Sequence, residues 1–265
     1  MYSSLTLLKK YVQYLIQSEN GKGHGVHSPF VFSFIKEILN NKRVAPLSVK
    51  IEAQRKLLEG NTRKIQVWDR GAGSRQTDHT QRSIQQIAKA ALKPKKYSQL
   101  LHKIVAYYQP VHILEMGTSL GITTCYLGAG NLNARLVTLE GAPNVAAIAK
   151  ETFNAVGLQH IELMEGDFNN TLPAYLNNVD PIGLAYVDGN HRYAPTIQYF
   201  NSLLEKSNEE TILIFDDIHW SAEMEKAWAE IKANPSVTLT IDLFFIGLVF
   251  VRKAQKEKEH FIIRY

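Results

Sequence analysis

The stretch from His112 to Gly121, HILEMGTSLG, constrains the fold of this chain more than any other. An apolar run with Glu115 near its end meets a turn that contains Gly117 and Gly121, and a helical pattern begins at Ile122. Glycines in such a turn let backbone N–H groups approach a ligand, and the N-terminus of the following helix adds a partial positive charge. The pattern therefore predicts a strand, a ligand-binding turn and a helix.

After Pro110 the sequence alternates between apolar runs and helical stretches, which indicates an α/β fold with a mostly parallel sheet covered on both faces. Each run ends in an acidic residue, and ligands bind at the carboxyl ends of such strands. Two further strands near the C-terminus predict an antiparallel hairpin, and Glu257–Tyr265 could add a short edge segment. The seven expected strands cover residues 113–116, 136–139, 161–164, 184–187, 212–215, 238–242 and 247–251.

We expect the first 96 residues to form a helical extension that caps the substrate, and residues 97–265 to form the α/β domain. Helical stretches are expected at residues 3–18, 30–39, 51–64, 83–92 and 97–108. In the first of them, Leu5, Leu8, Val12, Leu15 and Ile16 share helical spacing, so this apolar face needs a partner and is a candidate contact in a homodimer.

Two loops in this extension carry candidate functional groups. His24 and His27 could bind a metal or the substrate, or could simply hydrogen-bond to backbone. The glycines Gly71 and Gly73 lie in a polar stretch that we interpret as a loop near the mouth of the active site. Its arginines, Arg70, Arg75 and Arg82, could hold an anionic substrate or be ordinarily solvated.

Composition and charge narrow the class of protein. With 45% apolar residues, the chain can bury one large core, and no apolar run reaches the roughly 18 to 20 residues of a membrane span. Cys125 is the only cysteine, which excludes an internal disulfide and favours a cytoplasmic location, and we interpret it as a core residue. Residues 1–110 carry a net charge of +13 and residues 111–265 one of −8, so the basic part could bind an anionic acceptor or consist of solvated helix faces.

The glycine spacing resembles a particular family. A dinucleotide-binding turn has glycines two and then three residues apart, whereas this turn reads E-x-G-x-x-x-G. It resembles the first motif of class I methyltransferases that use S-adenosyl-L-methionine. The resemblance implies a Rossmann-like sheet whose glycine turn packs against the methionine part of the cofactor. The cofactor contacts that it implies here are Glu115, Gly117, Thr118, Ser119 and Gly121.

Two later acidic residues extend this cofactor prediction. Glu140, 25 residues after Glu115, follows the second strand, where a carboxylate can accept hydrogen bonds from ribose hydroxyls of any adenosine cofactor. The resemblance implies that Asp167, which follows Gly166 in the cofactor site, accepts a hydrogen bond from the adenine amino group. It also implies that Phe168 stacks on the adenine ring.

The last two parallel strands end in YVDGNH and IFDDIH, which place Asp188, Asp216 and Asp217 at neighbouring strand ends. Three carboxylates in one cleft repel one another unless a divalent cation or protons relieve the charge, and oxygen ligands suit Mg²⁺ or Ca²⁺. The arrangement resembles catechol-type and macrolide-sugar O-methyltransferases. That resemblance implies a magnesium site at the three aspartates, a cofactor contact and a catalytic role for Asp188, and a catalytic base at His191.

The sequence departs from the pattern of catechol-type enzymes at one position, and it offers a second candidate for the catalytic base. Catechol-type enzymes usually have Asp-Asn after the fifth strand, whereas this chain has Asp216 and Asp217. The extra negative charge would increase the affinity for a cation. Alternatively, no metal binds and the acids contact the substrate directly. His219 is the second candidate for the base.

The sequence therefore predicts a methyltransferase that acts on an oxygen of a small molecule, with divalent-metal assistance. RNA or a nucleotide-linked sugar could be the acceptor instead, although the chain lacks the Asn-Pro-Pro-Tyr motif of amino-directed nucleic-acid enzymes. The same pattern could also belong to a nicotinamide-dependent Rossmann oxidoreductase or to a binding module without catalytic activity.

Overall fold

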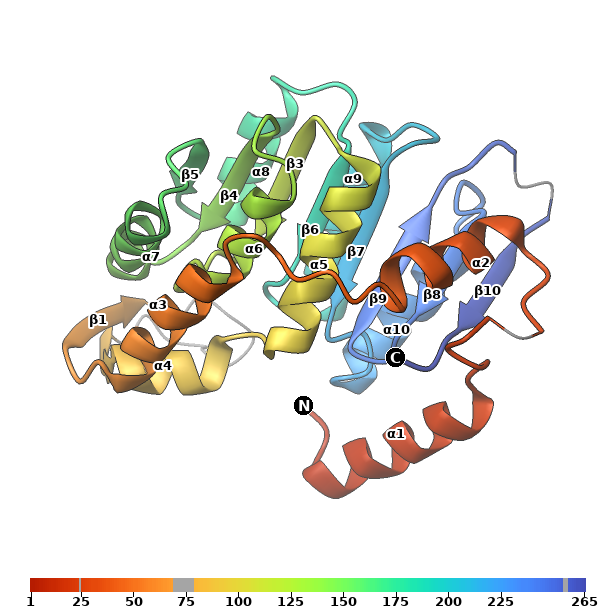
Figure 1. Ribbon diagram of the computed structural model, residues 1–265, viewed down its shortest axis with the longest axis horizontal. Coiled ribbons are helices and arrows are strands. Elements are labelled where there is room, and N and C mark those ends of the chain that lie inside the picture. The colour runs from red at the N-terminus through yellow and green to blue at the C-terminus, as the bar shows by residue number, and fades with distance from the viewer. Residues whose placement is uncertain (24, 69–78, 255–256) are drawn as a thin grey trace. The chain divides into compact units, whose positions relative to one another are not determined.

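The computed structural model describes residues 1–23, 25–68, 79–254 and 257–265 (Figure 1). The predictions for His24, Arg70, Gly71, Gly73 and Arg75 lie outside these residues. The chain divides into two compact units, one formed by Met1–Asn41 with Val179–Tyr265 and the other by Lys42–Asn178.

The main sheet has eight strands in the order β10-β8-β9-β7-β6-β3-β4-β5 within the described residues. Strand β9 is antiparallel to β7 and to β8, whereas β3 with β4, β4 with β5, β6 with β7 and β8 with β10 are parallel pairs. The predicted mostly parallel α/β sheet with a C-terminal hairpin is therefore confirmed. The edge segment expected near the C-terminus is a full strand, which makes eight strands rather than seven. The strands are β3 (His112–Met116), β4 (Arg135–Glu140), β5 (Ile161–Glu165), β6 (Leu184–Val187), β7 (Ile212–Asp216), β8 (Leu239–Asp242), β9 (Ile246–Phe250) and β10 (Glu259–Ile262).

The Lys42–Asn178 unit contains β3 to β5 and a separate hairpin of β1 (Lys64–Trp68) and β2 (His79–Ser83). The prediction of a helix up to Lys64 was wrong, because α3 ends at Gly60 and β1 begins at Lys64. In β1 polar and apolar residues alternate, and Val67 is buried while its neighbour Gln66 is exposed, so the strand has no continuous apolar run. The helices of this unit are α3 (Ser48–Gly60), α4 (Ile84–Ala91), α5 (Lys95–Tyr108), α6 (Ile122–Gly130), α7 (Pro143–Val156) and α8 (Phe168–Leu176).

The core of this unit joins α3, α4, α6 and α7, with Ile51, Ile84, Tyr126 and Ala149 among its buried members. Cys125 is fully buried in the same cluster, and burial raises the pKa of its thiol. The thiol is therefore held in its neutral form as a small apolar core group, as the sequence indicated.

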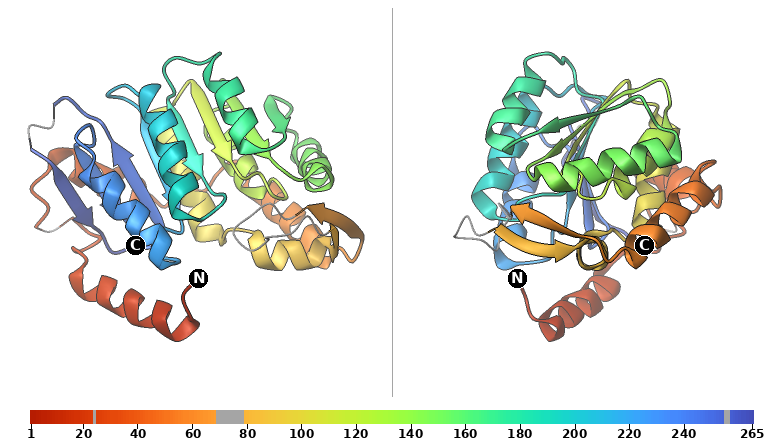
Figure 2. Two further views of the ribbon diagram at one scale, coloured as in Figure 1. Left: turned by 180° about the vertical axis from the view of Figure 1, so that it is seen from behind. Right: turned by 90° about the vertical axis from the view of Figure 1, so that its left-hand side faces the viewer.

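The other unit contains β6 to β10 with α1 (Ser4–Gln17), α2 (Pro29–Phe34), the π-helix η1 (Ile35–Leu39), α9 (Tyr193–Glu205) and α10 (Ala222–Ala233). Opposite views place α2 on one face of these strands and α9 with α10 on the other (Figures 1 and 2). Within the residues that the structure describes, no helix is both long and apolar enough to span a bilayer.

Helix α1 packs through Tyr14 rather than through its apolar stripe. Its N-cap, Ser3, accepts a hydrogen bond from the Thr6 N–H, and its buried residue is Tyr14. The apolar stripe is largely exposed instead: Leu5, Leu8, Val12 and Ile16 have exposed fractions of 64%, 58%, 47% and 79%. The sequence thus predicted the helix correctly, but an aromatic face of it packs against the unit.

Candidate functional site

The glycine turn after β3 has a backbone that ordinary side chains disfavour. Gly117 has φ +103°, Ser119 φ +49° and Gly121 φ +81°. The N–H groups of Gly117 and Thr118 donate to the Leu139 carbonyl of β4 at 3.0 and 3.2 Å, which fixes the turn at the end of the sheet. The turn thus brings the predicted cofactor contacts among residues 117 to 121 to the carboxyl ends of β3 and β4.

Glu115 is fully buried directly beneath this turn. Its Oε2 accepts hydrogen bonds from the hydroxyls of Thr124 on α6 and Thr138 on β4, the latter at 2.6 Å. The Thr138 and Thr118 hydroxyls are also 2.6 Å apart. The carboxylate therefore ties strand, turn and helix together, and a direct cofactor contact by Glu115 stays a prediction.

Glu140 at the end of β4 closes the turn from the other side. Its Oε2 accepts from the Ser119 N–H and its Oε1 from the Ala142 N–H, both at 2.9 Å. Burial raises the pKa of Glu140, although these backbone donors oppose the shift. Each carboxylate oxygen has a second lone pair, so the group can still accept hydrogen bonds from two ribose hydroxyls.

The predicted adenine-binding segment lies beside Glu140. The Gly166 N–H donates to the Glu140 carbonyl at 2.9 Å, and Gly166 itself has φ +141°. Asp167 then caps α8 by accepting from the Asn169 N–H, and the half-buried Phe168 begins the helix. Ribose-binding and adenine-binding candidates from separate strands thus meet at one edge of β4 and β5.

Asp188 and His191 lie in the other unit, directly after β6. The Tyr186 hydroxyl donates to Asp188 Oδ2 at 2.9 Å, and His191 Nε2 is 3.4 Å from Asp188 Oδ1. Both side chains are partly exposed, at 20% for Asp188 and 23% for His191. The structure therefore pairs the predicted base with a carboxylate that can orient its ring and stabilise its protonated form.

Asp216 and Asp217 lie at the end of β7, which pairs in parallel with β6, so they share an edge of this unit with Asp188. Asp216 is buried, and Asp217 has a left-handed backbone with φ +54°. Among the described residues, however, no group of three or more His, Cys, Asp or Glu side chains is arranged to hold a metal ion. As placed, the three aspartates do not form a metal-binding group.

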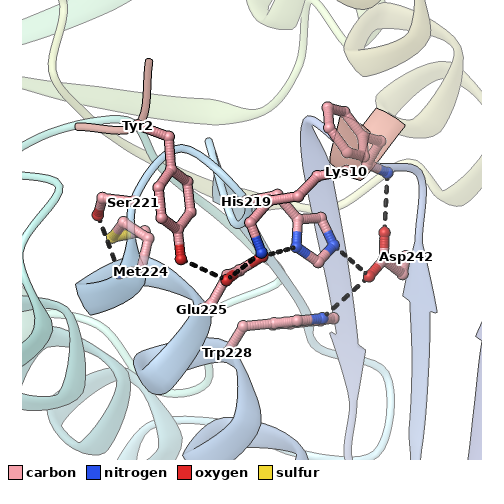
Figure 3. A network of polar contacts seen from close by, with 9 residues as sticks. Tyr2, Lys10, His219, Ser221, Met224, Glu225, Trp228 and Asp242 are labelled. Atoms are coloured by element: carbon pink, nitrogen blue, oxygen red, sulfur yellow. Dashed lines mark hydrogen bonds and ion pairs between the residues drawn. The ribbon is translucent and has the colours of Figure 1, made fainter. Parts of the chain in front are cut away.

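His219 has both ring nitrogens engaged. Nε2 is 2.8 Å from Asp242 Oδ2 and Nδ1 is 3.1 Å from Glu225 Oε1 (Figure 3). Burial alone would lower the pKa of His219, but the two carboxylates outweigh it and the pKa is raised. A ring held in this way is poorly suited to accept a substrate proton, which favours His191 as the base.

The partners of His219 were missed by sequence reasoning. Glu225 comes from α10 and Asp242 from the end of β8, and Lys10 and Tyr2 reach the same Glu225 from the N-terminus. No local motif links residues so far apart, so the only available signal was that β8, like the parallel strands, ends in an acid.

Comparisons with known proteins identify relatives of part of this chain. Residues 114–218 match the model of a family described as a methyltransferase domain. The chain is 29% identical over 126 residues to a catechol O-methyltransferase of Niastella koreensis, an alignment that covers 46% of this chain and 55% of that protein. It is also 30% identical over 113 residues to the O-methyltransferase imqG of Aspergillus flavus, over 40% of this chain and 45% of that one. The chain therefore spans about half the length of the curated relatives it matches.

The fold has close counterparts among solved structures. An O-methyltransferase from Bacillus cereus, solved in complex with SAH, superposes with a TM-score of 0.58 at 19% identity, over 83% of this chain and 97% of that one. The predicted resemblance to class I S-adenosylmethionine-dependent O-methyltransferases is confirmed, and so is the Rossmann-like methyltransferase sheet.

Replacing Gly121 by alanine tests the glycine turn. A Cβ at Gly121 would lie 2.6 Å from a Phe153 ring carbon, and φ +81° disfavours any side chain. We expect Gly121→Ala to lower the free energy of unfolding by about 1 to 3 kcal/mol, measured by urea denaturation. Gly60→Ala is the matched control, because nothing lies within 4 Å of its Cβ position. Equal stability of the two variants would contradict the geometry of the turn.

Proposed function

We propose that this protein transfers a methyl group from S-adenosyl-L-methionine to an oxygen atom of a small molecule. The observation that carries the proposal is the junction of Ser119, Glu140 and Gly166, where the glycine turn, a half-buried carboxylate and the segment before Phe168 are joined by hydrogen bonds. The match of residues 114–218 to a methyltransferase domain supports it.

The cofactor residues hold and orient the methyl donor. The glycine turn leaves room for the methionine part of the cofactor. Glu140 accepts hydrogen bonds from the ribose hydroxyls, and the Phe168 ring stacks on the adenine. When bound, S-adenosylmethionine supplies an activated methyl group on its sulfonium sulfur. Because transfer is an in-line displacement, the main task of these residues is positioning.

His191 performs the proton transfer in this proposal. Its ring removes the proton of the acceptor hydroxyl as the oxygen attacks the methyl carbon and the bond from carbon to sulfur breaks. Asp188, 3.4 Å from His191 Nε2, stabilises the imidazolium that forms. The products are the methyl ether, S-adenosylhomocysteine and one proton on His191.

The acceptor, assembly and compartment are finer proposals. We propose an anionic acceptor because residues 1–110 carry 19 Lys and Arg against 6 Asp and Glu. The exposed stripe of Leu5, Leu8, Val12 and Ile16 on α1 supports a homodimer. A single, buried and free cysteine, Cys125, supports a cytoplasmic location.

Calorimetric titration of S-adenosylhomocysteine tests the cofactor site. We expect binding to the purified protein and a loss of about 10- to 100-fold in affinity in Glu140→Ala, because a charged acceptor of two hydrogen bonds is removed. Glu162→Ala, at an exposed glutamate on β5, should bind like the wild type. Binding of NADH without S-adenosylhomocysteine would instead favour a nicotinamide-dependent oxidoreductase.

His191→Asn tests the proposed base. With catechol as the probe acceptor, we expect turnover to fall about 10²- to 10⁴-fold because the acceptor keeps its proton, while affinity for S-adenosylhomocysteine stays unchanged. His260→Asn, at an exposed histidine of β10, is the control and should keep its turnover. Wild-type turnover in His191→Asn would remove His191 from the mechanism.

Chelation tests the metal that the resemblance predicts at Asp188, Asp216 and Asp217. On that prediction, EDTA lowers catechol turnover at least about tenfold and Mg²⁺ restores it. The variant Asp217→Asn, which gives the Asp-Asn pair usual in catechol-type enzymes, should then keep its response to Mg²⁺. Turnover that is insensitive to EDTA would mean that the aspartates act on the substrate without a cation.

A further inference from the structure

The loop between β7 and α10, residues 217–221, carries one of the predicted acidic site residues in a strained backbone. Asp217 has φ +54°, and its N–H donates to the Phe245 carbonyl at 2.7 Å. The Trp220 N–H in turn donates to the Asp217 carbonyl at 2.9 Å. A non-glycine residue keeps such a conformation only where its surroundings hold it there.

His219 is the side chain that connects this loop to its surroundings. It bridges Asp242 at 2.8 Å and Glu225 at 3.1 Å (Figure 3). Asp242 also accepts from the Phe244 N–H at 2.8 Å and from the Trp228 indole at 3.2 Å, so it is firmly placed. The His219 ring therefore joins the loop to β8 and α10 at once.

Residues of the N-terminus complete the same network. Glu225 Oε2 accepts from the Tyr2 hydroxyl at 2.7 Å and from the Lys10 ammonium at 2.9 Å. The Tyr2 N–H also donates to the Trp220 carbonyl of the loop at 3.0 Å. The start of the chain thus contacts both the loop and the carboxylate that holds His219.

Aromatic packing provides a second connection between α1 and His219. The His219 ring stacks on Phe244 with centroids 5.2 Å apart and an interplanar angle of 26°. Tyr11 and Tyr14 of α1 contact the same Phe244 ring at centroid distances of 5.0 and 5.3 Å. Helix α1 therefore contacts two partners of His219, through charge at Glu225 and through rings at Phe244.

We propose that His219 is a positioning residue for the acceptor side of the methyl transfer, and that Tyr2 and Lys10 help to hold it. In this proposal the network keeps Asp217 in its left-handed backbone and so fixes the direction of the acidic pair after β7. The inference rests on the proposed function, because the orientation of Asp216 and Asp217 affects turnover only if these side chains act on the acceptor.

A purely structural role would be that the network only anchors α1 to the rest of the unit. The two roles predict different measurable effects when the network is lost. An anchor changes global stability, whereas a positioning network also changes local opening at Asp217 and turnover, without changing cofactor affinity. The predicted glycine-turn, ribose and adenine contacts belong to the Lys42–Asn178 unit, and among the predicted cofactor contacts only Asp188 lies in the unit of His219. Affinity for S-adenosylhomocysteine therefore serves as an internal reference.

Amide hydrogen exchange at Asp217, followed by NMR, tests the proposal directly. We expect exchange at least about tenfold faster in His219→Leu and in Lys10→Met, because a hydrogen-bonded contact that restrains the loop is lost. Lys9→Met is the matched control, since Lys9 is an exposed neighbour on the same helix. Lys10→Arg keeps the ion pair with Glu225, so its amide exchange at Asp217 should stay as slow as in the wild type.

Turnover of catechol by the full-length protein adds a functional measurement. We expect kcat to fall about 10- to 100-fold in His219→Leu, with KM for S-adenosylmethionine unchanged, as for residues that orient a site from behind. The double variant Lys10→Met with His219→Leu should lose less than the two single losses combined, because both changes act through Glu225.

Unchanged exchange at Asp217 in His219→Leu, with only a lower unfolding temperature, would overturn the positioning role and leave an anchor. Failure of the proposed function has a different signature. If the wild type neither binds S-adenosylhomocysteine nor methylates catechol, the enzyme proposal fails, and exchange at Asp217 alone then decides whether His219 holds the loop.

Discussion

The structure of the Lys42–Asn178 unit depends on one buried carboxylate, Glu115. A carboxylate without exposure to water is costly unless hydrogen bonds compensate it, and two hydroxyl groups donate to Oε2 of this one. Thr124 and Thr138 both donate to Glu115, and they come from the helix and the strand that flank the glycine turn. Because the compensation is shared between β4 and α6, the turn has little freedom to move independently of either element.

The same physical requirement organises the other unit around Asp242. This aspartate ends β8 with a nearly buried side chain and contacts an imidazole, an indole N–H and a backbone N–H. These groups come from three different segments, so satisfying one buried charge brings together the β7–α10 loop, α10 and the β8–β9 turn. In both units a buried acid at a strand end gathers the loops that the proposed chemistry uses.

The sequence was sufficient for features that repeat along the chain. The sheet and the acids at strand ends could be predicted because apolar runs of similar length end in charged residues, and Glu140 and Asp167 lie where that register puts them. Strand β1 could not be predicted, because a two-stranded hairpin with alternating polar residues resembles a polar loop. The orientation of α1 could not be predicted either. Its tyrosines pack on Phe244 while its aliphatic stripe stays exposed, and periodicity alone does not rank two faces of one helix.

The edge strand β5 has a consequence for how the molecule behaves at high concentration. Edge strands expose unpaired backbone groups that can recruit a second chain, and natural sheets block this with charge. The exposed positions of β5 are Glu162, held by Arg135, and Glu165, held by Lys150. Within the part of the chain that the structure describes, β5 ends the sheet, and these two ion pairs place charges of both signs on it. We expect strand addition by another molecule there to bury charges that have no new partner, which disfavours aggregation at this edge although Ile161, Leu163 and Met164 are apolar.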